Sequence, residues 1–215
     1  WSQHLRINLH SPIPVAKGMA SSTADIAATA IATARYFDKT LTEQALAQLC
    51  VNLEPTDSTP FRQLTLFDHN QGHAQTAGSQ QPQLDILVLE SPQTLQTADY
   101  HRLDRQAALL TGAPQLEQAW QKARLACETG SARLLGEAAT LSAIASQLIL
   151  PKPGFQRVLD MVEHFSLYGV SIAHSGSVMG LMLDRTKHDV DAVMAELERD
   201  EGNLLWPQKY LLPMV

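Results

Sequence analysis

Apolar residues recur along the chain with two different periods, which together predict a mixed protein of helices and strands. Alternation of apolar and polar residues, or a short continuous apolar run, is typical of a strand, whereas apolar residues spaced at helical intervals are typical of a helix. The predicted strands cover 4–10, 63–67, 84–90, two stretches within 169–184, and 208–214. The predicted helices cover 21–37, 40–53, three pieces within 97–149, 155–167 and 188–199.

Proline, glycine and small polar residues mark the ends of these elements. The helical stretch 97–149 is predicted to break near Gly112-Ala-Pro114 and near Thr129-Gly130-Ser131. Thr40-Leu-Thr-Glu43 matches a capping box, in which two side chains satisfy the first backbone N–H groups of a helix, and it predicts the start of the second helix. The polar residues 68–83 predict a hairpin connection or an exposed loop.

The order of these elements predicts an α+β protein of two lobes. The first lobe is expected over residues 1–90 and the second over 91–215. With 215 residues, 45% of them hydrophobic, the chain is long and apolar enough to bury a sizeable core.

Charge and cysteine content narrow the classes of partner. The net charge is −6 without a block of lysine or arginine, which argues against nucleic acid or an anionic membrane as the main partner. No apolar run reaches the roughly 18 residues that span a bilayer, and no signal-peptide pattern is seen. Cys50 and Cys127 lie in helical patterns without metal-ligand neighbours, which predicts thiols in a reducing cytoplasm and no disulfide.

The segment from Pro12 to Asp25 is a loop of small residues that leads directly into an alanine-rich helix. Small residues on both sides of Gly18 let the backbone approach a bulky anion, and a helix beginning at Ser21 or Ser22 directs its free N–H groups into the loop. The pattern therefore indicates a phosphate site, in which a serine hydroxyl can also ligate a metal. An ordinary serine-capped helix after a turn explains the composition equally well.

The order of residues in this loop resembles a known motif. Pro14-Val-Ala-Lys-Gly18-Met-Ala-Ser21-Ser22-Thr-Ala24 is similar to the phosphate-binding motif of the GHMP kinases, Pro-x-x-x-Gly-Leu-Gly-Ser-Ser-Ala. Met19 replaces the leucine, and Ala20 replaces the second glycine and narrows the backbone angles allowed there. The order of residues from Pro14 to Asp25 resembles one branch of the family, the L-threonine kinases of cobalamin synthesis and propanediol utilisation. Because family members carry strands and a first motif before this loop, we expect Trp1 to begin a fragment or a restarted numbering.

The resemblance implies both a fold and an activity. The fold would be the two-lobed GHMP-kinase fold, with an incomplete lobe like ribosomal protein S5 and a ferredoxin-like C-terminal lobe. The activity would be phosphorylation of the side-chain hydroxyl of L-threonine by ATP with Mg²⁺. The alternatives are a kinase for another hydroxyl acceptor, such as homoserine, and a non-catalytic domain that binds a nucleotide or metabolite. The partner implied in either enzyme is a small amino acid with a hydroxyl group, and the sequence does not predict an oligomeric state.

The resemblance also implies residues that contact ATP. His174-Ser-Gly-Ser-Val-Met-Gly180 is similar to the third, glycine-rich motif of the family, which packs beside the phosphate loop, although a β-hairpin turn explains its glycines as well. Lys17 can add a charge against the phosphates or be a solvated loop lysine. The implied ATP contacts are Pro14, Val15, Ala16, Lys17, Gly18, Met19, Ala20, Ser21, Ser22 and Gly176.

A second cluster, Glu54-Pro-Thr-Asp57-Ser, resembles the carboxylates that serve catalysis in the family. The resemblance implies Ser22 and Glu54 as ligands of Mg²⁺ and Asp57 as the group that orients or deprotonates the acceptor hydroxyl. Residues 54–60 also make a good turn without any catalytic role.

Three further residues are predicted to contact the substrate: Asp25, His174 and Ser175. Asp25 can instead approach the metal or stabilise the first turn of its helix, and a histidine at a strand end is often structural. Lys152–Phe155 and Tyr100–Arg102 are weaker candidates to line the acceptor site.

Overall fold

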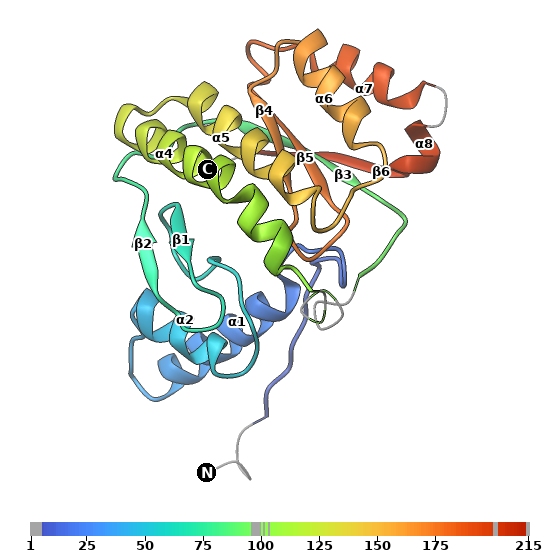
Figure 1. The fold of residues 1–215 in the computed structure, drawn as a ribbon. Helices are drawn as coiled ribbons and strands as arrows, with labels where there is room; N and C mark the ends of the chain where they lie inside the picture. Colours follow the sequence, from blue (N-terminus) through green and yellow to red (C-terminus); the bar gives the residue numbers. More distant parts are fainter. Residues whose placement is uncertain (1–5, 96–99, 101, 103, 200–201, 214–215) are drawn as a thin grey trace. The chain divides into compact units, whose positions relative to one another are not determined.

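The computed structural model describes residues 6–95, 100, 102, 104–199 and 202–213 (Figure 1). The chain divides into two compact units. The first unit contains the chain up to Val15 together with Met19–Thr76, and the second contains Ala16–Gly18 together with Ala77–Val215. Within the predicted phosphate loop, Ala16–Gly18 therefore belongs to the second unit and the residues on either side belong to the first. None of the helices in the described part of the chain is long and apolar enough to cross a membrane.

The first unit consists of two helices and a small hairpin. Helix α1 spans Ser21–Tyr36 and α2 spans Glu43–Val51, while β1 (Thr65–Phe67) pairs antiparallel with β2 (Ala74–Thr76). Helix α1 agrees with the predicted helix 21–37. Only Thr23 of its residues is fully buried.

Three local predictions for this unit are wrong. Arg6–His10 does not form a strand, because alternation alone makes no strand without a neighbour to share backbone hydrogen bonds. The N-cap of α2 is Thr42 rather than Thr40, since the Thr42 hydroxyl accepts the Ala45 N–H at 3.1 Å. The connection 68–83 contains strand β2, which its polar composition did not indicate.

The second unit is built on a four-stranded antiparallel sheet in the order β4-β5-β3-β6. These strands are β3 (Asp85–Glu90), β4 (Gly169–Ile172), β5 (Met179–Leu183) and β6 (Gln208–Pro213). The helices are α4 (Gln106–Thr129), α5 (Ala132–Ser146), α6 (Phe155–His164), α7 (Val190–Glu198) and α8 (Gly202–Leu205). Helices lie between β3 and β4 and between β5 and β6, which is the βαββαβ order of a ferredoxin-like fold. Strand β3, which was counted with the first predicted lobe, pairs here with β5 and β6.

The main core of the second unit lies between the sheet and helices α6 and α7. Leu87, Leu89 and Leu181 of the sheet pack with Val158 of α6 and with Trp206, and all five side chains are at most 1% exposed. Figure 1 shows α4 and α5 running side by side, and α5 also packs against β4. Cys127 of α4 is a buried free thiol, as is Cys50 in the first unit, and burial raises the pKa of both thiols. The prediction that both are buried core thiols is confirmed.

Helix α4 continues through Gly112 and Pro114, so the predicted break there is wrong. An internal proline costs a helix roughly 3 kcal/mol, but α4 packs along α5 and this tertiary contact overrides the local preference. The second predicted break is confirmed. Gly130 has a left-handed backbone (φ 68°), and the Ser131 hydroxyl then caps α5 by accepting the Leu134 N–H at 3.3 Å.

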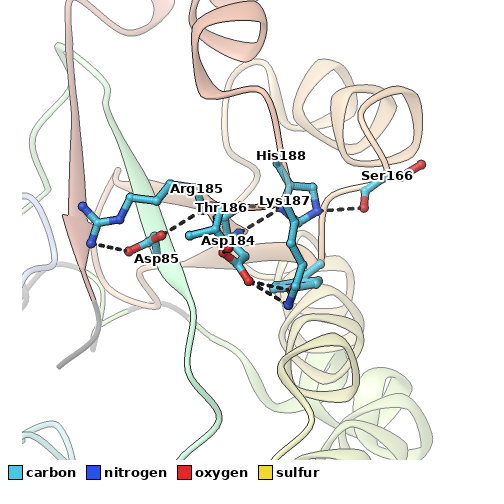
Figure 2. A network of polar contacts seen from close by, with 8 residues as sticks. Asp85, Ser166, Asp184, Arg185, Thr186, Lys187 and His188 are labelled. Carbon is cyan, nitrogen blue, oxygen red and sulfur yellow. Dashed lines mark hydrogen bonds and ion pairs between the residues drawn. The ribbon is translucent and has the colours of Figure 1, made fainter.

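A network of polar contacts fixes the connection after β5 (Figure 2). Asp184 accepts hydrogen bonds from the Lys187 ammonium at 2.8 Å and from the Thr186 hydroxyl at 2.6 Å. The neighbouring Arg185 pairs with Asp85 of β3 at 3.1 Å. The Lys187 and Thr186 hydrogen bonds hold the pKa of the Asp184 carboxyl well below its usual range.

We expect Asp184→Asn to lower the melting temperature at neutral pH. The carboxylate is stabilised in the folded state, so its contribution is fully present above the ordinary pKa of 3.8 and is lost as pH falls below that value. Melting curves of the variant and the parent, recorded from neutral pH downward, should therefore converge at acid pH. A difference in melting temperature that is the same at every pH would contradict the prediction.

Candidate phosphate loop and kinase site

Residues with a positive φ angle alternate with other residues along the backbone of the predicted phosphate loop. Ala16, Gly18 and Ala20 have positive φ angles of 59°, 83° and 54°, while Lys17 and Met19 between them do not. Successive residues of opposite handedness direct their N–H groups to one side and form a concave nest that binds anions. The local conformation is therefore suited to a phosphate group.

Helix α1 begins immediately after this loop and has no side-chain cap. Its N-cap is Ala20, whose left-handed conformation (φ 54°, ψ 33°) is the one that the second glycine of the family motif would adopt freely. No side chain accepts a hydrogen bond at this cap, so the alternative of a serine-capped helix is wrong. The N–H groups of the first turn, which starts at Ser21, are thus available to a ligand.

We expect Ala20→Gly to preserve the loop and to change stability little. A left-handed alanine costs roughly 1–2 kcal/mol, and glycine removes that cost. Glycine also increases the entropy of the unfolded chain by roughly 0.4–1 kcal/mol, which offsets much of the gain. Urea unfolding should therefore place the variant within about 1 kcal/mol of the parent, on the stable side. A loss of stability would show that the Ala20 methyl group makes a packing contribution that its conformation does not indicate.

Within the second unit, Lys17 and Gly18 lie against the turn that joins β4 to β5. The N–H groups of Ser177 and Val178 donate to the Lys17 carbonyl at 3.0 and 3.3 Å. A Cβ on Gly18 would lie 2.7 Å from the Gly176 Cα, and a Cβ on Gly176 would lie 2.3 Å from the Gly18 Cα. The two glycines therefore allow the backbones to meet directly, and Gly176 contacts the loop as the family motif implied.

The Lys17 side chain is directed toward backbone carbonyls that follow β3. Its ammonium donates to the Ser91 carbonyl at 2.6 Å and to the Gln93 carbonyl at 3.1 Å. The Ser177 hydroxyl donates to the same Gln93 oxygen at 2.6 Å. The solvated-lysine alternative is therefore wrong, because Lys17 anchors the loop to the end of the sheet.

Within the first unit, a pair of threonines ties the two predicted catalytic segments together. The hydroxyl groups of Thr23 in α1 and Thr56 in the 54–60 loop are 2.7 Å apart, and the two residues are 3% and 2% exposed. Ser22 precedes Thr23, and Asp57 follows Thr56. Both Ser22 and Asp57 are exposed, so the buried threonine pair holds two accessible oxygen-bearing side chains in adjacent segments.

The predicted magnesium ligands are two oxygen-bearing side chains, those of Ser22 and Glu54. In the described residues, no group of three or more His, Cys, Asp or Glu side chains is arranged to hold a metal ion. Magnesium needs only one or two protein oxygens because it keeps several waters and binds substrate phosphates. The Ser22 hydroxyl is exposed and Glu54 is half-buried, and the two stay predicted ligands of this kind.

The predicted substrate contacts occupy two different environments. Asp25 lines a groove of the first unit whose other walls are mostly apolar, including Ile26 and Phe37. His174 is exposed and Ser175 is half-buried in the turn between β4 and β5. Of the weaker candidates, His101 lies outside the described residues. Sequence patterns missed the buried Thr23–Thr56 pair, and they named Lys152 only as a weaker candidate without indicating that it is buried.

Comparison with known proteins places the chain in a family. Residues 2–61 match the family of GHMP kinase N-terminal domains. The chain is 60% identical over 214 residues to an L-threonine kinase of Citrobacter freundii and 57% identical over 215 residues to an L-threonine kinase of Salmonella typhimurium. These alignments cover all of this chain and 74% and 72% of the two relatives.

Solved structures agree at the level of the fold. A homoserine kinase from Cytophaga hutchinsonii superposes with a TM-score of 0.70 at 15% identity, covering 95% of this chain and 68% of that one. A galactokinase from Lactococcus lactis superposes with a TM-score of 0.64 at 13% identity, covering 94% and 66%. With the loop, the glycine contact and the identity to the curated relatives, these comparisons show that the chain belongs to the GHMP kinases, a family of phosphotransferases with hydroxyl acceptors.

Proposed function

We propose that the protein transfers the γ-phosphoryl group of ATP to the side-chain hydroxyl of L-threonine, giving O-phospho-L-threonine and ADP. The observation that carries this proposal is the loop from Ala16 to Ala20, in which residues with a positive φ angle alternate with others and which leads into the uncapped N-terminus of α1. The acceptor is inferred from the two curated relatives, which are 60% and 57% identical and named for L-threonine.

The proposed nucleotide contacts are mainly backbone groups. The N–H groups of the loop and of the first turn of α1 bind phosphate oxygens, and the helix dipole favours their negative charge. Phosphoryl transfer needs positioning and charge stabilisation more than covalent chemistry, so such a backbone cradle suits the reaction. The contact between Gly18 and Gly176 supports the loop in this conformation. We retain Pro14 to Ser22 and Gly176 as the proposed ATP-binding residues.

Side chains of the first unit supply the remaining chemistry. Ser22 and Glu54 would hold Mg²⁺, which when bound neutralises charge on the β- and γ-phosphates. The Asp57 carboxylate accepts a hydrogen bond from the threonine hydroxyl and takes its proton as the oxygen attacks the γ-phosphorus and the bond to the ADP oxygen breaks. Asp25, His174 and Ser175 are proposed to contact the amino-acid substrate.

The resemblance also suggests a setting for the reaction. We infer that the product supplies the aminopropanol linker of cobalamin and that the reaction takes place in the cytoplasm. The buried free thiols of Cys50 and Cys127 are compatible with a reducing compartment.

The direct test is a product assay with several acceptors. The protein, with any sequence that flanks these 215 residues in its gene, is incubated with MgATP and separately with L-threonine, L-serine, L-homoserine and mevalonate. ADP release is followed, and phosphorus NMR identifies the product. Phosphothreonine formed from L-threonine alone would support the proposal. Phosphohomoserine would support the alternative acceptor, and MgATP binding without turnover on any acceptor would support a non-catalytic binding domain.

A further inference from the structure

Lys152 carries an ammonium group that is buried in the second unit. Its side chain is only 6% exposed, although lysine is among the residues least often buried. It lies between Pro151 and Pro153 in the connection from α5 to α6, and its backbone N–H donates to the Gln147 side chain at 2.7 Å. The ammonium donates to the carbonyl oxygen of Gly176.

Among the residues that the structure describes, this ammonium has no carboxylate partner. Throughout the described ranges of the chain, the Gly176 carbonyl is the one polar group that the Lys152 ammonium contacts, and no Asp or Glu pairs with it. Burial without a counter-charge disfavours the charged form and lowers the pKa of Lys152 to about 8. The group is still mostly protonated at neutral pH, so the fold carries a buried positive charge. An apolar side chain of similar volume would pack in the same place without a charge.

The Gly176 carbonyl, which accepts from Lys152, belongs to a peptide group whose N–H also makes a hydrogen bond. The C=O of Gly176 and the N–H of Ser177 are the two ends of one peptide unit, and this N–H donates to the Lys17 carbonyl at 3.0 Å. The Lys17 carbonyl in turn belongs to the same peptide unit as the Gly18 N–H. An unbroken series of hydrogen bonds and peptide groups therefore runs from the Lys152 ammonium to the Gly18 N–H of the phosphate loop.

Such a series transmits both position and polarisation. A cation donating to one end of a peptide group makes its N–H a stronger donor, and each hydrogen bond in a chain strengthens the next. The Gly18 N–H is thereby oriented and made more positive, and it is one of the backbone donors assigned to phosphate in the proposed function.

We propose that Lys152 is a positioning residue for the nucleotide phosphates, acting on the Gly18 N–H through the Gly176–Ser177 and Lys17–Gly18 peptide groups. This inference rests on the proposed function of the loop, and it assigns to Lys152 no contact with either substrate.

The test compares two substitutions that separate charge from hydrogen bonding. Lys152→Met removes both, whereas Lys152→Gln removes the charge and keeps an N–H donor. Lys122→Met is the matched control, because Lys122 lies on α4 and pairs at the surface with Glu137 at 2.6 Å. Calorimetric titration with MgATP in the absence of acceptor gives the nucleotide affinity, and steady-state kinetics gives KM for ATP and for L-threonine.

We expect Lys152→Met to weaken MgATP binding about ten- to a hundredfold, as loss of a charge-assisted hydrogen bond does. KM for ATP should rise while KM for L-threonine stays within about twofold. Lys152→Gln should recover part of the affinity, and Lys122→Met should match the parent. Unchanged MgATP affinity in a folded Lys152→Met protein would overturn the proposal. Equal losses for both substrates with a lowered melting temperature would also overturn it, since they indicate general destabilisation.

Amide hydrogen exchange tests the role of Lys152 independently of the proposed function. In Lys152→Met, the Ser177 amide should exchange faster than in the parent, whichever acceptor the protein uses and even without turnover. Unchanged exchange at Ser177 would show that the ammonium does not hold this peptide. A parent protein that makes no phosphothreonine, but whose Ser177 amide responds to the substitution, would refute the proposed acceptor while retaining the positioning role.

Discussion

The substitution Gly176→Ala is expected to weaken nucleotide binding strongly and to destabilise the second unit. The new Cβ would lie 2.1 Å from the Lys17 carbonyl oxygen and 2.3 Å from the Gly18 Cα. Both are backbone atoms, so the clash is relieved only if the turn and the loop separate. Overpacking costs roughly 1–3 kcal/mol or more, and we expect the free energy of unfolding in urea to fall by about that amount. MgATP affinity, measured by calorimetry, should fall at least about 100-fold because a shift of the cradle misplaces every donor.

Gly112→Ala is the matched control for this effect. A Cβ on Gly112 would meet Ala145 Cβ at 3.5 Å, an ordinary van der Waals contact, and the position lies within helix α4. Alanine is favoured over glycine in a helix by up to about 1 kcal/mol, so this variant should be as stable as the parent or more stable. If Gly176→Ala bound MgATP as tightly as Gly112→Ala, the close contact between the two backbones would not be needed for binding.

Asp57→Asn is expected to remove turnover while leaving MgATP binding intact. Asparagine has nearly the same shape and can still hydrogen-bond to a hydroxyl, but it cannot accept a proton. A general base contributes about 10²–10⁴-fold to a rate, and kcat should fall within that range. Because Asp57 is exposed and follows the buried Thr56, the substitution should leave the Thr23–Thr56 pair and the melting temperature unchanged. Initial rates of ADP release and calorimetry with MgATP test the two halves of the prediction.

Asp191→Asn provides the control for Asp57→Asn. Asp191 is exposed in the first turn of α7 and has no proposed role, so its substitution should change neither kcat nor nucleotide affinity. A kcat for Asp57→Asn close to that of the control would show that Asp57 is not the base. Loss of MgATP binding in Asp57→Asn would instead indicate that this carboxylate helps to bind the metal.

The local sequence correctly predicted where helix α1 begins after the phosphate loop. Gly18 and the serines that follow specify a turn and a helix start within a few residues, so the position of α1 could be inferred without knowledge of the rest of the fold. The same holds for the break at Gly130, where a left-handed glycine ends one helix and Ser131 caps the next. Such features depend on the conformational preferences of the residues themselves.

Features that depend on distant parts of the chain could not be predicted in this way. The 2.7 Å contact between Thr23 and Thr56 joins residues from separate elements, and nothing in either segment specifies the other. Pro114 is the opposite case, where a strong local signal was overridden because α4 packs along α5. The burial of Lys152 likewise results from how the α5–α6 connection packs, and its sequence neighbours do not indicate it.

The buried amine of Lys152 also provides a chemical probe for opening of the fold. Amine-reactive reagents attack the uncharged form, and with a pKa of about 8 this lysine carries far more of that form at neutral pH than a surface lysine does. Because the side chain is only 6% exposed, its acylation must wait for a fluctuation that uncovers it. The labelling rate at this single position, read by mass spectrometry, therefore measures how often the second unit opens near its glycine turn, and a bound nucleotide should slow it.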